Sequence, residues 1–309
     1  MGLNAGTAAD VIQTKLDKVF NQEFNGEQHP GHATAETGQV FKQDTASNRK
    51  VIMEIFKGVG AWDSAVGEED NFPEGTAAVG NEKTFSVGKF AKSLPIPRDY
   101  FDDDEHSTVN MAVRNFGRRG RTTRDNNAMG LWRGSFATYT TADGAYICSN
   151  THTNQAGSTI DNLETSALSP ATLKTSIAKL YQQKAQDDVI DGHLASVLLV
   201  APANYDYACE ITKSELKADT AENNMNPYSS IYNLWVFTSP YLGDTPGGDD
   251  DDWWLMSSTH AMTRFIRRPI DTYLRDYKET DNETYKYRGS FREVVGCPTY
   301  EGIIGHNVA

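Results

Sequence analysis

The chain has 309 residues, of which 38% are hydrophobic, and a formal net charge of -13 from 42 acidic and 29 basic residues. This length is sufficient for one large or two modest domains with sizeable cores. The excess of acids argues against a protein that binds nucleic acid by neutralising its phosphates, because that mode of binding requires a basic surface.

Other classes of protein are also disfavoured. No apolar stretch approaches the roughly 20 residues that a membrane helix needs, and the N-terminus lacks the regions of a signal peptide, so we expect a cytosolic protein. Cys148, Cys209 and Cys297 are far apart, odd in number and without a CxxC pair. They predict neither a disulfide framework nor a zinc site.

The N-terminal part combines a helical pattern with a polar stretch. Apolar residues recur at helical spacing between residues 11 and 24, and residues 26–43 are rich in Gly, His and Thr. Such a segment cannot bury a core by itself. Taken alone, the pattern fits a flexible tail with one short helix.

Residues 51–97 predict a protruding hairpin. Residues 51–56 have the pattern of a strand, residues 58–80 are rich in Gly and acids, and residues 84–97 return in near-alternation. Long loops of this kind are commonly binding elements or disordered segments. The turn residues at 71–75 fit the tip of such a hairpin.

A long helix is predicted from about residue 105 to 133. The acids at 102–105 complement a helix start, and an apolar stripe follows, although three glycines cost about 0.8 to 1.0 kcal/mol each relative to Ala. Six arginines are distributed around the helix and not along one face: Arg114, Arg118, Arg119, Arg121, Arg124 and Arg133. This spacing disfavours a DNA-binding stripe. It favours a solvated face, or pairing with carboxylates across subunit contacts, for which the acidic hairpin tip is an available partner.

The following part of the chain predicts an α/β layer. We expect a strand at 143–148, a helix that starts at Ser169 and Pro170, and a strand at 197–200 that is buried on both faces. A helix at 205–216 and strands at 231–237 and 253–256 complete the layer. Segments 262–268, 273–277 and 285–294 alternate, which predicts long antiparallel strands.

Candidate chemical sites are weak. Four consecutive carboxylates at 249–252 could offer oxygens to calcium, but their spacing matches no known loop signature, so a solvated acidic loop is favoured. His29 and His32 have no matching cluster, and we interpret His152 as a hydrogen-bonding loop residue. Nucleophile elbow, zinc-protease and phosphate-loop motifs are absent. Paired acids such as Asp187 and Asp188 fit ordinary surface charge. We therefore expect no catalytic residue, no metal and no cofactor.

The order of segments 90–104, 143–154, 196–202 and 233–242 resembles the major capsid proteins of tailed phages. More narrowly, it resembles the Mu-type major head subunits within the Johnson, or Hong Kong 97-like, fold. The resemblance covers roughly residues 50 to 295. It implies an α+β fold with five parts: an N-terminal arm along neighbouring subunits (1–50), an extended β-hairpin loop (51–101), a peripheral domain with a spine helix (102–134 and 259–294), an axial α/β domain (135–258) and a C-terminal segment (295–309).

The resemblance also implies a function. The chain would self-assemble into hexamers and pentamers of an icosahedral shell that encloses double-stranded DNA without sequence-specific binding, in the host cytoplasm, and would end in the virion. It would not be an enzyme. Its partners would be identical copies, a separate scaffolding protein, a portal and possibly a decoration protein. The candidate inter-subunit contacts are Glu68, Glu69, Asp70, Glu74, Arg114, Arg118, Arg121 and Arg124.

Two alternatives remain open. An encapsulin-type compartment would share the fold and the assembly but would hold protein cargo. An acidic extracellular binding module or glycosidase would instead be monomeric.

Overall fold

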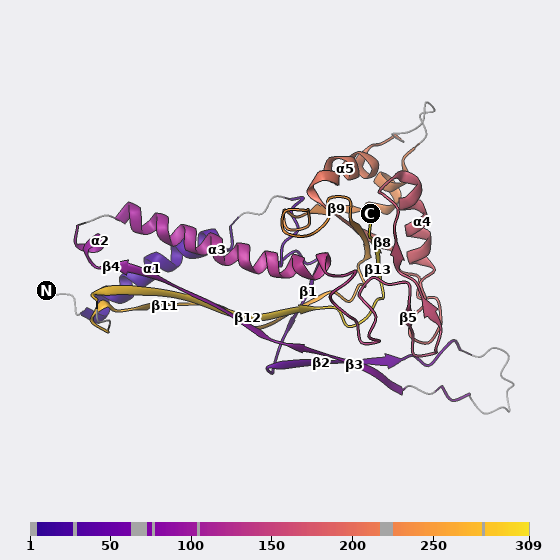
Figure 1. Ribbon diagram of the computed structural model, residues 1–309, viewed down its shortest axis with the longest axis horizontal. Coiled ribbons are helices and arrows are strands. Elements are labelled where there is room, and N and C mark those ends of the chain that lie inside the picture. Colours follow the sequence, from indigo (N-terminus) through magenta and orange to yellow (C-terminus); the bar gives the residue numbers. More distant parts are fainter. Residues whose placement is uncertain are drawn as a thin grey trace.

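The fold is described from a computed structural model, which covers residues 5–26, 30–62, 73–75, 78–103, 106–216, 225–279 and 282–308 (Figure 1). The molecule is elongated, with a narrow part built on one long helix and two long strands and a broader part around a second sheet. Among the described helices, none is long and apolar enough to span a bilayer.

The narrow part contains a four-stranded sheet. Its order is β1 (Lys42–Thr45), β11 (Thr263–Arg275), β12 (Thr284–Gly296) and β4 (Gly88–Pro97), and only β1 and β11 are parallel. The sequence predicted two separate strands where β11 runs continuously. Pro269 interrupts the alternation, and two register shifts, one between Ile266 and Arg268 and one across Pro269 between Arg268 and Asp271, let the strand continue. A short 3-10 turn at Tyr277–Glu279 follows β11.

Helices cover one face of this sheet. They are α1 (Ala5–Phe24), the short α2 (Asp99–Asp102) and the expected long helix, α3 (His106–Arg133). Phe20 of α1 is buried against Val113 and Tyr287. A Cβ atom at Gly117 would lie 2.7 Å from the carbonyl oxygen of Phe20, so this glycine lets the two helices approach closely.

In its described residues, the N-terminal part is therefore not a flexible tail but packs on its own chain. Helix α1 packs on α3, and Ala35, Val40 and Phe41 are fully buried in the core of the broad part. Strand β1 then joins the four-stranded sheet. The physical reason is that the apolar stripe of α1 meets a complementary stripe on α3 of the same chain.

The broad part contains a five-stranded sheet of order β7 (Leu163–Glu164), β13 (Ile303–His306), β10 (Trp253–Ser257), β8 (Ala195–Val200) and β9 (Trp235–Thr238). Helices α4 (Pro170–Tyr181) and α5 (Tyr205–Lys213) pack on one face, and the end of α3 packs on the other. Strand β8 is buried on both faces, as its apolar run predicted. The C-terminal segment supplies β13, between β7 and β10.

Local signals set several boundaries of this part. Ser169 forms a capping box with Thr172, as expected for the start of α4. The strand predicted at 143–148 is wrong: Asp143 accepts hydrogen bonds from Thr141 and Ala145 and holds a turn in its place. The predicted strand at 231–237 begins only at Trp235. The remaining short elements are β5 (His152–Thr153), β6 (Thr159–Ile160), the 3-10 turn Pro202–Asn204 and the π-helical turn Tyr228–Tyr232.

A hairpin projects from the other side of the four-stranded sheet and runs below the five-stranded sheet (Figure 1). It consists of β2 (Lys50–Lys57) and β3 (Ala78–Ser86), paired from Lys50 with Ser86 to Lys57 with Ala78. The returning segment 84–97 is thus two strands in two sheets, because β4 pairs with β12. A cluster of Ala46, Phe85, Val87 and Phe265 holds the base of the hairpin.

Candidate functional site

The two faces of the hairpin differ in what they contact. On the inner face, Ile55 is buried, the amine of Lys83 donates to the Thr140 hydroxyl over 2.8 Å, and the Gly60 amide donates to the Asp187 carboxylate over 3.1 Å. On the outer face, Ile52 is 55% exposed and Phe56 is 60% exposed. An exposed apolar face on a projecting element is a candidate interaction surface.

The exposure continues toward the tip. The side chain of Trp62 is 94% exposed, and Val59 and Val79 are also open to solvent. Tryptophan side chains are highly buried on average in folded proteins, so an almost fully exposed one adds to the candidate interaction surface.

The structure places the predicted contact residues in different environments. Glu68, Glu69 and Asp70 lie outside the described residues, and Glu74 is exposed. Arg114 is exposed, Arg121 is half-buried, and Arg118 is exposed but lies 3.3 Å from the Glu23 carboxylate of α1. Arg118 thus has an ion pair within its own chain.

Arg124 departs from the expectation most strongly, because it is only 2% exposed and cannot present its charge to another subunit. Its guanidinium lies 2.5 Å from the Glu36 carboxylate and stacks over the ring of Phe24. The Arg264–Glu293 pair lies in the same buried charge cluster. Arg124 therefore joins the N-terminal segment to α3.

Burial shifts the ionisation of this cluster. It lowers the pKa of the Arg124 guanidinium and raises the pKa values of the Asp125 and Glu293 carboxyl groups, while the opposite charges around them act against these shifts. The Asp125 carboxylate also accepts a hydrogen bond from the Ala35 amide over 3.1 Å. Buried charges that are paired and hydrogen-bonded in this way fix the relative position of the elements that carry them.

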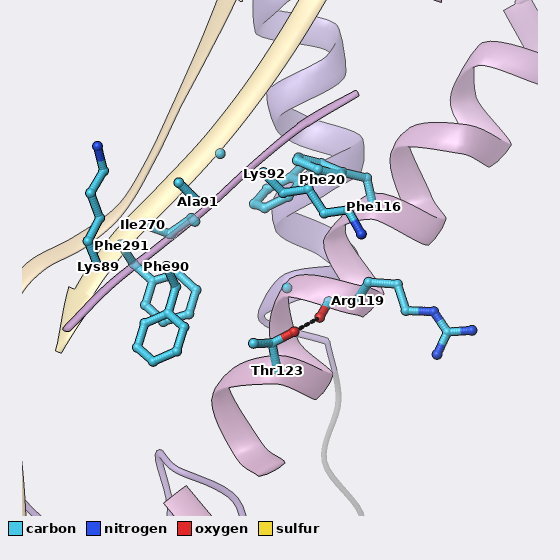
Figure 2. A pocket seen from close by; sticks show the side chains of 12 residues that line it. Phe20, Lys89, Phe90, Ala91, Lys92, Phe116, Arg119, Thr123, Ile270 and Phe291 are labelled. Carbon is cyan, nitrogen blue, oxygen red and sulfur yellow. Dashed lines mark hydrogen bonds between the residues drawn. The ribbon is translucent and has the colours of Figure 1, made fainter. Parts of the chain in front are cut away.

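A cavity of about 350 Å³ lies between α1, α3, β4 and β12. Figure 2 shows Phe90 and Phe291 on its sheet side and Phe20 and Phe116 on its helix side, with the guanidinium of Arg119 extending away from it. Phe90 and Phe291 stack with their ring centres 4.9 Å apart. The Thr123 hydroxyl donates to the Arg119 carbonyl. The lining combines apolar side chains with Lys89, Lys92, Arg119 and Thr123 and contains no carboxylate.

The histidine and carboxylate pairs have structural partners. The buried His152 ring contacts the Asp143 carboxylate through Nδ1 over 2.8 Å, and its Nε2 faces the Ile147 carbonyl. That carbonyl occupies the position in which a nucleophile would have to lie, so the pair holds a loop, as the sequence predicted for His152.

The acidic loop at 247–252 is organised by its own backbone. Asp244 and Asp250 exchange hydrogen bonds from amide to carboxylate, each over 3.3 Å. Asp252 is buried and accepts from the Val308 amide over 3.1 Å. Across the described part of the chain, no group of three or more His, Cys, Asp or Glu residues could hold a metal ion.

Comparisons with known proteins identify the family. The family model described as "Phage capsid protein" matches residues 81–304. A comparison with curated proteins finds no match.

Solved structures share the fold at low sequence identity. The virus-like particle from Pyrococcus furiosus is 9% identical with a TM-score of 0.55, covering 96% of this chain and 99% of that chain. The capsid of Myoviridae phage XM1 is 13% identical with a TM-score of 0.51, covering 92% and 94%. The capsid of cyanophage P-SCSP1u is 11% identical with a TM-score of 0.54, covering 92% and 91%.

The family match covers well over half of the chain and includes α3 and the strands from β4 to β12. The likeness to solved structures extends the agreement in fold to α1 and the hairpin. The family match leaves out α1, β2 and the first residues of β3. The chain therefore belongs to the phage capsid protein family, and it is a major capsid protein of the tailed-phage type with the Hong Kong 97-like fold, a structural protein of the virion and not an enzyme.

Proposed function

We propose that copies of this chain form hexamers and pentamers of an icosahedral shell, and that the outer face of the β2–β3 hairpin makes the principal contact between neighbours. The observation that carries this proposal is the apolar face of Ile52, Phe56 and Trp62, which nothing in the described chain covers. Full burial of each such side chain contributes about 1.5 to 3 kcal/mol.

Such a contact becomes strong through repetition. Each subunit in a ring meets its neighbours through different surfaces, so the contacts are heterologous and can close around five-fold and six-fold axes. Modest individual contacts then add through high effective concentration. Early steps of assembly stay reversible, and the closed shell is held by all contacts together.

Charged residues add direction to these contacts. We propose Glu68, Glu69, Asp70, Glu74, Arg114, Arg118 and Arg121 as inter-subunit contact residues, and we leave out the buried Arg124. Exposed ion pairs are typically worth about 0 to 1 kcal/mol, so they set register more than affinity.

The partners follow from the demands on a DNA-filled shell. We propose a separate scaffolding protein, because identical contacts can close with different curvatures. We also propose a portal, because DNA must enter the shell, and a decoration protein. The net charge of -13 suits a wall that encloses DNA without holding it. The order of strand-like segments supports placement in the Mu-type group. An encapsulin-type shell would share the fold, but the family match favours a phage capsid.

The test replaces apolar residues on the outer face. We expect negative-stain microscopy of the wild type to show shells, rings or tubes. The double variant Phe56→Ser and Trp62→Ser should keep the circular dichroism of the wild-type subunit and lose these assemblies. Trp62→Phe keeps an aromatic ring and serves as the control. Shells of normal yield from the double variant would refute the role of the hairpin.

A further inference from the structure

Three cations stand directly opposite one another across the four-stranded sheet. Arg268 of β11 pairs in register with Arg292 of β12, which pairs with Lys89 of β4. Like charges in directly opposite positions destabilise a sheet. Among the described residues, no carboxylate forms an ion pair with any of the three. The Arg268 guanidinium donates to the Ser290 hydroxyl over 2.7 Å, but the buried Nε atoms of Arg268 and Arg292 have no hydrogen-bond partner. We call these residues the cation row.

The cation row points away from the helices. Tyr287 and Phe291 pack against Phe20 and Phe24 of α1, and successive side chains of a strand alternate between faces, so Arg292 projects from the opposite face. In Figure 1, the long helices lie on one side of this sheet, and the hairpin leaves from the other side toward the five-stranded sheet. The cation row is thus on the face that the helices leave open.

The hairpin carries a matching pair of acids. Glu54 of β2 stands directly opposite Glu82 of β3, and both side chains are exposed. In the described structure neither forms an ion pair. Ile52 and Phe56 flank Glu54 on the same outer face, because they lie two residues away on either side of it. This face combines exposed apolar groups with two unneutralised negative charges.

We propose that the Glu54 and Glu82 face of the hairpin of one copy docks on the cation row of a second copy. The inference rests on the proposed role of the hairpin in assembly and names its receptor. Each surface holds like charges in opposite positions while the subunit is alone, and docking neutralises both. The sequence paired the acidic tip with arginines of α3, but Arg124 is buried and Arg118 already contacts Glu23.

The spacing of the two surfaces agrees with this docking. Side chains on one face of a strand repeat about every 6.8 Å, which is twice the rise of 3.4 Å per residue. When the acid pair lies on the cation row, the next apolar position of the hairpin falls on the row of Ala91, Ser290 and the exposed Asp271. The row beyond that contains the exposed ring of Tyr273.

The hairpin cannot reach the cation row of its own chain. The Gly60–Asp187 and Lys83–Thr140 hydrogen bonds hold its inner face against the broad part of the molecule. Its outer face is therefore turned away from its own chain. The occupant of the cation row is the hairpin of another copy.

The test exchanges the charges of the two surfaces. The receptor variant Lys89→Glu with Arg292→Glu and the hairpin variant Glu54→Lys with Glu82→Lys should each raise the protein concentration at which light scattering detects shells by at least about tenfold, because the loss recurs in every subunit. The variant with all four substitutions should restore assembly. Lys174→Glu, an exposed lysine of α4, is the charge-matched control.

A second measurement guards against misfolding. Lys89→Gln with Arg292→Gln removes the repulsion without adding a charge, so the unassembled subunit should resist urea at least as well as the wild type while it still assembles less readily. The difference from the wild type should shrink at 1 M salt, where the Debye length is about 3 Å.

The outcomes separate this inference from the proposed function. Normal assembly of the receptor variant, or failure of the four-fold variant to recover, would overturn the docking while the wild-type shells still support the proposed function. If the wild type forms no shells under any condition, the proposed function itself fails, and the docking with it.

Discussion

Replacing Phe20 by Ala tests whether α1 belongs to the body of its own subunit. Phe20 is 1% exposed, and its ring centre lies 5.4 Å from that of Phe24, 5.6 Å from Phe116 and 6.0 Å from Tyr287. Truncating a buried Phe to Ala typically costs about 3 to 5 kcal/mol. The better helix propensity of Ala returns about 0.5 kcal/mol. We expect the free energy of unfolding to fall by about 3 to 4 kcal/mol.

The assay is urea unfolding of the unassembled subunit, followed by circular dichroism at several low protein concentrations. Val11→Ala in the same helix is the control, because Val11 is 48% exposed and its truncation should change stability by about 0.5 kcal/mol or less. If Phe20→Ala leaves the unassembled subunit as stable as the wild type, α1 does not pack on its own chain. The helix would then be an arm that finds its partner only on a neighbour.

Two further predictions concern buried charges. Arg124→Ala should cost about 3 kcal/mol or more in urea unfolding, because it removes the buried cation nearest to Glu36 and Asp125 and leaves only Arg264, 3.9 Å away, beside Glu36. Arg118→Ala should cost less than about 1 kcal/mol, and equal losses would contradict the assigned burial. Burial, with Asp249 and Asp251 nearby, raises the pKa of the Asp252 carboxyl from 3.8 to about 7. Between these two pH values the folded subunit binds more protons than the unfolded chain, so its stability falls as pH rises through that window. Asp252→Asn should therefore be more stable than the wild type at pH 8, by at most about 4 kcal/mol, and should match it near pH 4; an equal difference at both pH values would refute the shift.

The elements that the sequence predicts well are those that local residues determine. Ser169 and Pro170 start α4 wherever the helix packs, because the cap hydrogen bonds are made within one turn. The apolar run of β8 fits only a strand with both faces covered. The long α3 follows from its apolar stripe, whereas the acids expected in its first turn lie before it, with Asp102 at the end of α2.

The elements that depend on distant partners were missed. The turn at Asp143 requires His152 and Thr153, whose contacts with its carboxylate no local pattern reveals. From the sequence, the N-terminal segment cannot bury a core by itself. In the structure, α3 supplies the apolar residues against which α1 packs. Gly117 is one of the three glycines counted as a cost to the helix, although it lets α1 approach α3 closely.

The contact residues show the same limit. Counting arginines around a helix does not separate the exposed Arg114 from the buried Arg124. A signal was available, because Arg124 lies four residues after Gly120 and four before Ala128, on the stripe that faces the core. The acid pair and the cation row could not be found from the sequence, because both depend on the register between strands.

Hydrogen exchange on the unassembled subunit and on assembled particles tests the central claim most directly. The claim is that the hairpin face is completed by another copy, whereas α1 is completed by its own chain. Amides of β2 and β3 should exchange quickly in the subunit and become strongly protected in the particle, while those of α1 are protected in both. Particles in which the hairpin exchanges as fast as in the free subunit would contradict the account.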